Sequence, residues 1–128
     1  MRALHAALRR DLSRLGDAAT QLGSSAAAPP TVLAGWDAFR AQLDNHHSAE
    51  DDGLWPVLRR ELSDPGELAA VDAMVAEHRH IPPALAEADA ALRGTGELTA
   101  PVKRLSTILL DHLAHEERAR YFPSSSST

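Results

Sequence analysis

Apolar residues recur every three to four positions along four stretches of the chain, at about 2–22, 31–62, 65–93 and from about 100 onward. This is the period of one face of an α-helix, and no stretch alternates with the period of a strand. The pattern therefore predicts an all-α chain of four helices. The predicted inward stripes contain Met1, His5, Leu8, Leu12, Leu15, Ala19 and Leu22; Trp36, Phe39, Leu43, His46, Glu50, Leu54 and Val57; Leu68, Val71, Val75, His78, Pro82, Leu85 and Leu92; and Val102, Leu105, Leu109, His112 and Glu116.

Segments rich in Gly, Pro and Ser separate the helices. GSSAAAPP at 23–30 predicts a linker, and SDPGE predicts a strong helix start with Asp64 as the N-cap, Pro65 at the first helical position and Glu67 three residues after the cap. In GTGELT, Thr99 is the expected cap of the last helix. Connections this short favour an antiparallel up-down-up-down four-helix bundle.

Prolines inside two of the predicted helices should distort them. Pro56 is expected to kink the second helix near its end. Pro82 and Pro83 remove two backbone donors and should bend the third helix beside His78.

Composition bounds the class of protein. The 128 residues predict one domain, a bundle over 1–122 followed by a disordered Ser-rich tail at 123–128. A net charge of -5 without a basic stripe argues against nucleic-acid binding, and no run is long and apolar enough for a membrane span or a signal peptide. The absence of cysteine excludes disulfides and thiolate ligands and fits a cytoplasmic protein, expected to be a monomer or a weak homodimer.

Polar residues interrupt all four apolar stripes. Histidine and glutamate stand four residues apart in two helices, on one face about 6 Å from each other, and single histidines interrupt the other two stripes. With a rise of about 1.5 Å per residue, the antiparallel topology brings all of them to one level of the bundle. Burying such groups is costly unless they are compensated, and a pair of metal ions is the simplest compensation. The candidate ligands are His5, His46, Glu50, His78, His112 and Glu116.

Imidazole and carboxylate donors without sulfur suit iron, manganese or zinc. Two glutamates from opposite helices are placed to bridge two metals. His5 and His46 can complete one metal, and His78 with His112 the other. Open positions on each metal would remain for water, dioxygen or peroxide.

Several neighbouring residues leave alternatives open. His47 can replace His46 as the ligand or hydrogen-bond from outside, Glu117 can substitute for Glu116, and His115 faces either solvent or the edge of the site. Asp51 and Asp52, like Glu117, are expected on a solvated acidic face. Glu77, Asp44 and Asp111 adjoin ligands and either orient imidazoles or lie at the surface.

LHAALRRDL, LDNHHSAEDDGLWPVL, AEHRHI and DHLAHEER together resemble the hemerythrin-like, HHE cation-binding domains. The resemblance covers roughly residues 2 to 122 and implies a four-helix bundle with two non-haem irons joined by an oxo or hydroxo bridge, although zinc or manganese would also fit. It implies ligation by the six candidate residues and interaction with O2, peroxide or NO, with at most a weak catalase- or peroxidase-like activity. A metal or redox sensor without catalysis is the alternative function, and a metal-free structural bundle is the third.

One position departs from the family pattern. Oxygen-carrying hemerythrins have two histidines four residues apart on the third helix, whereas the residue four before His78 is Met74. Two imidazoles per metal would leave a more open centre, better suited to peroxide or redox turnover than to reversible oxygen carriage.

Overall fold

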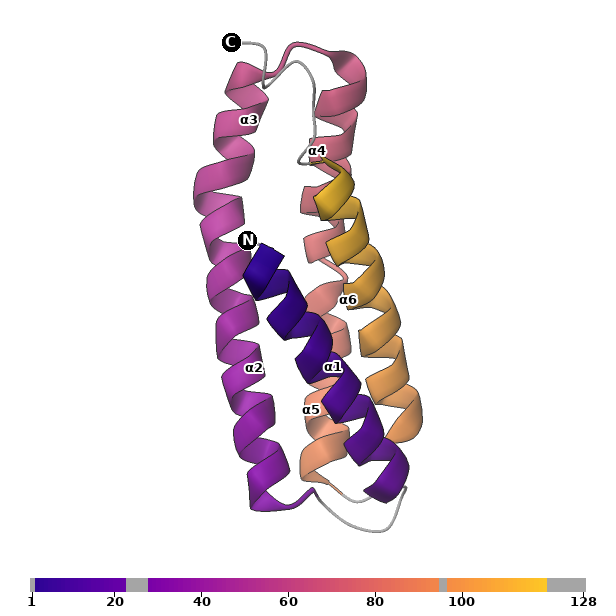
Figure 1. Cartoon of the computed structure of the whole chain (residues 1–128). Helices are drawn as coiled ribbons and strands as arrows, with labels where there is room; N and C mark the ends of the chain where they lie inside the picture. The colour runs from indigo at the N-terminus through magenta and orange to yellow at the C-terminus, as the bar shows by residue number, and fades with distance from the viewer. Residues whose placement is uncertain (1, 23–27, 95–96, 120–128) are drawn as a thin grey trace.

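Four antiparallel helical rods make up the described part of the chain, residues 2–22, 28–94 and 97–119 of the computed structural model (Figure 1). The first rod is α1 (Arg2–Leu22) and the last is α6 (Thr99–Ala119). The second rod runs through α2 (Pro30–Ala49), the π-helical turn η1 (Glu50–Leu54) and α3 (Trp55–Glu61), and the third through α4 (Pro65–His78) and α5 (Ile81–Arg93). The predicted all-α, up-down-up-down bundle is confirmed.

The apolar stripes of the rods meet in one large core and one small one. The large core joins α1, α2, α5 and α6, and the small one joins α3 and α4 through Trp55, Leu62, Val71 and Met74. Figure 1 shows why there are two: α1 begins about halfway along the second rod, so α3 and α4 extend beyond it. The polar level described below lies between the two cores.

The second rod departs from the single kinked helix that the sequence predicts. The N–H of Trp55 donates to the carbonyl of Glu50, five residues back, and this wider turn adds one residue to the helix. The inward face therefore shifts, so that Trp55 is buried and Val57, predicted on the stripe, is 41% exposed. Pro56 lies in the first turn of α3, where its missing N–H is tolerated.

The third rod breaks beside His78, as the two prolines predict. α4 ends at His78, and α5 begins at Ile81 with Pro82 and Pro83 in its first turn. Pro82 is exposed and is replaced in the core by Ile81, so its place on the predicted stripe is wrong.

The start of α4 follows the capping signal in the sequence, whereas the start of α6 does not. Asp64 caps α4 by accepting a hydrogen bond of 2.9 Å from the N–H of Glu67, as predicted. Thr99 is the first residue of α6 rather than its cap, because the Glu97 carboxylate accepts from the N–H groups of Thr99 and Ala100 at 2.7 and 2.9 Å. Residues 23–27 of the predicted linker at 23–30, residues 95–96 and the predicted tail at 123–128 lie outside the described residues.

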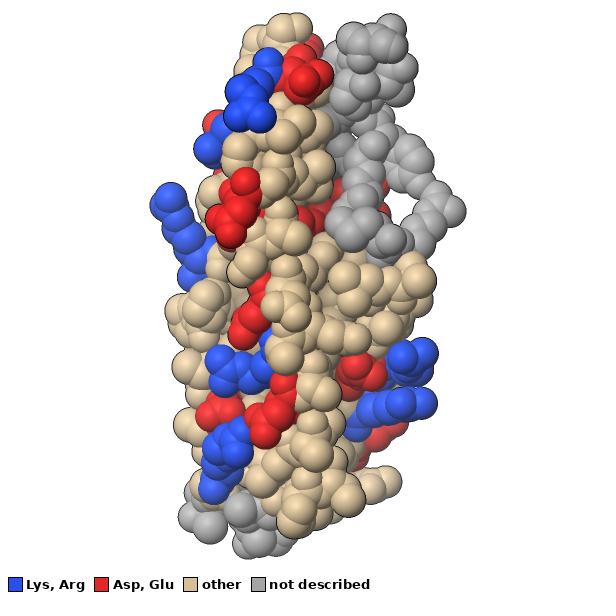
Figure 2. Space-filling view, turned by 90° about the vertical axis from the view of Figure 1, so that its left-hand side faces the viewer, with Lys and Arg blue, Asp and Glu red and all other residues tan. Residues whose placement is uncertain are grey.

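Charged side chains of both signs are interspersed on the face formed by the second rod (Figure 2). No basic stripe is visible there, in agreement with the overall negative charge. No helix in the described ranges combines the length and apolarity needed to cross a bilayer.

Asp89 offers a test of the fold away from the polar level. Its carboxylate accepts from Trp36 Nε1 at 2.9 Å and Arg93 Nε at 3.0 Å, and these contacts, the indole first, lower its pKa below the ordinary 3.8. A lowered pKa gives stability above the unfolded value that is lost as the pH falls through the folded one. Asp89→Asn should therefore lower the free energy of unfolding by about 1 kcal/mol in urea titrations at pH 7. The difference should shrink and then vanish as the pH falls from 3.8 through the lowered pKa of the folded state, and an equal difference at neutral and strongly acidic pH would contradict the assignment.

Candidate metal centre

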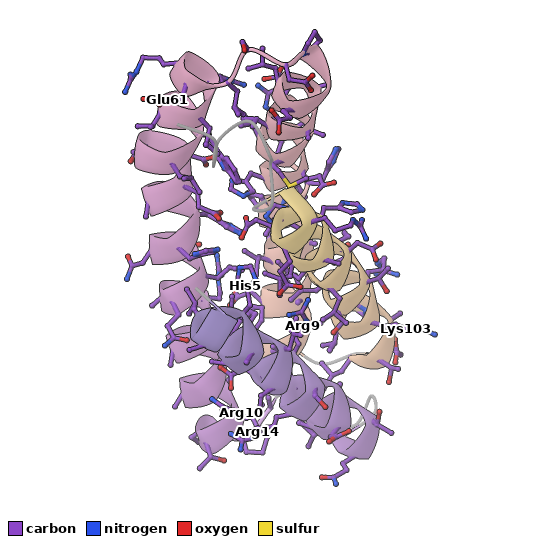
Figure 3. All side chains as sticks on the ribbon, turned by 45° about the horizontal axis from the view of Figure 1, so that its top comes forward. His5, Arg9, Arg10, Arg14, Glu61 and Lys103 are labelled. Carbon is purple, nitrogen blue, oxygen red and sulfur yellow. The ribbon has the colours of Figure 1, made fainter. Side chains whose placement is uncertain are left out.

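All six predicted site residues lie at one level of the bundle and face each other. His5 comes from the start of α1, where it points in between the helices (Figure 3), and His78 is the last residue of α4. His46 lies in the last turn of α2, Glu50 opens η1, and His112 and Glu116 occupy the last turns of α6. None is more than 8% exposed.

Glu116 lies at the centre of this level and is fully buried. One of its oxygens, Oε1, is 2.9 Å from His5 Nε2 and 3.2 Å from His46 Nε2. The other, Oε2, is 3.2 Å from His112 Nε2. The two oxygens of one carboxylate therefore face different histidines.

Glu50 has the same two-sided placement. Its Oε2 is 3.2 Å from His46 Nε2, and its Oε1 is 3.4 Å from His78 Nε2. Both glutamates thus lie between a histidine on one side of the level and a histidine on the other.

The donor atoms fall into two groups, each with all its atoms within 4.8 Å of one another. Donors about 2.0–2.2 Å from one ion lie at most about 4.4 Å apart, so only small shifts would let each group hold one ion. The first group is His5, His46 and Glu116; the second is His47, Glu50, His78 and His112. His46 and His47, which the sequence offered as alternatives, therefore both have a nitrogen near a donor group, His46 in the first and His47 in the second.

Carboxylates outside the level hold three of the imidazoles in one tautomer. Because a carboxylate only accepts, the Nδ1 atom of each ring carries a hydrogen, and Nε2, which faces the centre, is the atom that can bind a metal once its own proton is displaced. This is the tautomer that metal ligation through Nε2 requires. The donations are His5 Nδ1 to Glu117 at 2.9 Å, His78 Nδ1 to Asp51 at 2.9 Å and His112 Nδ1 to Glu77 at 2.8 Å.

Two of these outer partners have a contact that the sequence analysis did not predict. Asp51 is exposed and Glu117 is partly exposed, as expected for a solvated face, but each also binds a site histidine. Glu117 does not take the place of Glu116, because it pairs with both terminal nitrogens of Arg9 at 2.6 and 2.8 Å. Each of these two acids directly follows a site glutamate, which is the sequence feature that could have identified them.

The structure also places the other residues near the site whose roles the sequence left open. Glu77 binds His112 and, through its other oxygen, His115 Nδ1 at 2.7 Å, so His115 belongs to the edge of the site. Asp44, Asp52 and Asp111 are exposed.

The centre requires positive charge. His78 Nε2 and His112 Nε2 are 3.0 Å apart, and two lone pairs at this distance repel unless a proton or a metal ion lies between them. The contact with Glu116 raises the pKa of His5, and burial lowers that of His112 but is outweighed by Glu116 and Glu77. Burial would raise the pKa of Glu116, yet the imidazoles hold it far below its ordinary value. In the absence of metal, protons supply the charge, and a metal would displace them.

Two further groups are held in fixed charge states. The Arg9 guanidinium lowers the pKa of Glu117 to about 2, so this carboxylate remains an acceptor for His5. Burial, with the neighbouring His78 and His112, lowers the pKa of His47 to about 3, so its imidazole is neutral near pH 7.

The chain matches the hemerythrin HHE cation-binding domain over residues 1–123. It belongs to this family. Comparisons with curated proteins and with solved structures give no match. For a hemerythrin HHE domain, the nitrogen and oxygen donors of the two groups agree with cation binding, the property by which the family is described.

Proposed function

We propose that this hemerythrin HHE domain holds two irons side by side and interacts there with dioxygen, peroxide or nitric oxide. The observation that carries the proposal is the placement of Glu50 and Glu116, each with its two oxygens facing histidines on opposite sides of the level. A carboxylate in that position is suited to bridge two cations.

The proposed ligands divide between two metal positions. His5 and His46 would hold the first, and His78 and His112 the second. Glu50 and Glu116 would be shared, because each has oxygens that face histidines of both positions. The fit rests on the donor set, on the Nε2 lone pairs that the outer carboxylates direct inward, and on the need for positive charge between His78 and His112. Iron would supply one-electron chemistry and open positions for a small ligand.

A hollow at the surface gives small molecules a path toward the second position. It has a volume of about 350 Å³ and lies between the second and third rods. His78 and its partner Asp51 belong to its lining, together with Trp55 and Arg79. A diatomic molecule or peroxide that enters it reaches the outer edge of His78, whose Nε2 faces the centre.

Anaerobic loading with Fe²⁺ tests the proposal. We expect about two irons per chain by elemental analysis, and a change in the near-ultraviolet absorption when oxygen, peroxide or nitric oxide is added. The matched variant is Glu50→Gln. It replaces one of the two carboxylate oxygens that Glu50 offers, one to each metal position, and it should retain at most one iron.

Other outcomes separate the alternatives. Binding of two irons with no optical response to any of the three molecules would favour the metal or redox sensor. A single zinc, or no metal after iron supplementation, would contradict the iron pair. A Glu50→Gln protein with both irons would show that the bridge is misassigned.

A further inference from the structure

His47 is not among the six proposed ligands, yet one of its nitrogens is buried beside them. Its Nε2 atom is shielded from solvent and has no hydrogen-bond partner among the residues that the structure describes. By contrast, the Nε2 atoms of His5, His46 and His112 each lie within 3.2 Å of a glutamate oxygen. A buried nitrogen without a partner costs free energy, so its position calls for a cation or another partner.

The ring of His47 lies against the second metal position. Its centroid is 4.2 Å from that of His78 and 5.5 Å from that of His112. One of its nitrogens is within 4.8 Å of the donor atoms of Glu50, His78 and His112. Three imidazoles and one carboxylate, contributed by α2, η1, α4 and α6, therefore surround one point.

Consecutive residues of α2 can serve two metal positions. Neighbouring side chains on an α-helix point about 100° apart, so His46 faces the first position when His47 faces the second. His46 Nε2 lies 3.2 Å from an oxygen of each glutamate, whereas His47 lies on the side of His78.

The third rod offers only one imidazole to this position. Met74, one turn before His78, is apolar and packs with Trp55, Leu62 and Val71 in the small core. An additional nitrogen donor must therefore come from another helix, and His47 is the residue in reach.

We propose that His47 is the third imidazole ligand of the position formed by Glu50, His78 and His112. The two metals then have unequal donor sets, with three imidazoles at this position and two, from His5 and His46, at the other. This inference rests on the proposed metal pair, and it predicts unequal affinities for the two ions.

Zinc titration of the metal-free protein tests the inference. The wild type should bind two Zn²⁺ ions in separate steps, and His47→Gln should weaken one step by at least about 10-fold while changing the other less than about 3-fold. His80→Gln is the matched control, because His80 is exposed and lies outside both groups. Unchanged affinities in His47→Gln would overturn the ligand assignment, and a wild type that takes fewer than two ions would overturn the metal pair itself.

Nitrogen-15 NMR of the histidine side chains gives a direct reading on the unaltered protein. His47 Nε2 should move from the range of a neutral free imidazole to that of a metal ligand when Zn²⁺ is added, whereas the His80 signals should stay unchanged. A His47 Nε2 signal that remains in the free range in the fully loaded protein would overturn the proposal even if the variant failed to fold. A thermal melt of metal-free His47→Gln that matches the wild type would exclude a packing role as the cause of weaker binding.

Discussion

Replacing Glu116 with glutamine should abolish the binding of both metal ions while the four-helix bundle remains folded. Glu116 contacts His5 and His46 through one oxygen and His112 through the other. Glutamine keeps the size of the side chain, but its NH2 group is a donor and cannot replace an oxygen ligand. Loss of an outer partner of a ligand costs about 10–100-fold in metal affinity, and loss of a shared ligand should cost more than that.

Elemental analysis and circular dichroism measure the two parts of this expectation. Glu117→Gln is the control, because Glu117 is adjacent in the sequence but binds only the outer nitrogen of His5 and the side chain of Arg9. It should retain both metals with weaker affinity. Two metals retained by Glu116→Gln would mean that the carboxylate is not shared between them.

The sequence could predict the level of the site because helix geometry fixes it. The i, i+4 spacing of His46 with Glu50 and of His112 with Glu116 places each pair on one face, and the antiparallel order brings the pairs to one height. Burial then follows from the apolar residues on the same stripes, and the structure finds both pairs buried.

The π-helical turn could not be predicted from the period of the apolar residues. A single added residue rotates everything after it, so Trp55 replaces Val57 on the inward face. Apolar residues occur on both faces of this segment, and the choice between them is made by packing against α4, which no local pattern records.

Two of the outer carboxylates, Asp51 and Glu117, were missed for a similar reason. Asp51 is exposed and Glu117 is partly exposed, so by composition they belong to a solvated surface. Their partners His78 and His5 come from other rods. Their adjacency to the site glutamates is a hint in the sequence, but the tertiary arrangement determines which imidazoles they hold.

The position of His47 also changes the expectation of a uniformly open centre. That expectation assumed two imidazoles per metal. Met74 stands where oxygen-carrying hemerythrins have a second histidine on the third helix. His47 lies among the donors of the second position, which removes the premise there. Under the proposed ligand set, the metal held by His5 and His46 has more open positions for a small ligand than the metal held by His47, His78 and His112.

Metal loading should raise the melting temperature of the domain by about 15–25 °C when the free metal concentration is about 100 times the dissociation constant of each site. Each ion that binds only the folded state then adds about 2.7 kcal/mol, and the increments of two ions sum because they share one cooperative unit. In the metal-free state the same buried imidazoles and glutamates have one another and the outer carboxylates as partners among the described residues. Thermal melts with metal and with excess chelator measure the shift.

Two variants serve as controls. Asp89→Asn should show the full shift, since Asp89 binds Trp36 and Arg93 away from the site. Glu116→Gln should show no shift. A wild-type shift below about 5 °C would mean that the ions do not bind in the buried centre.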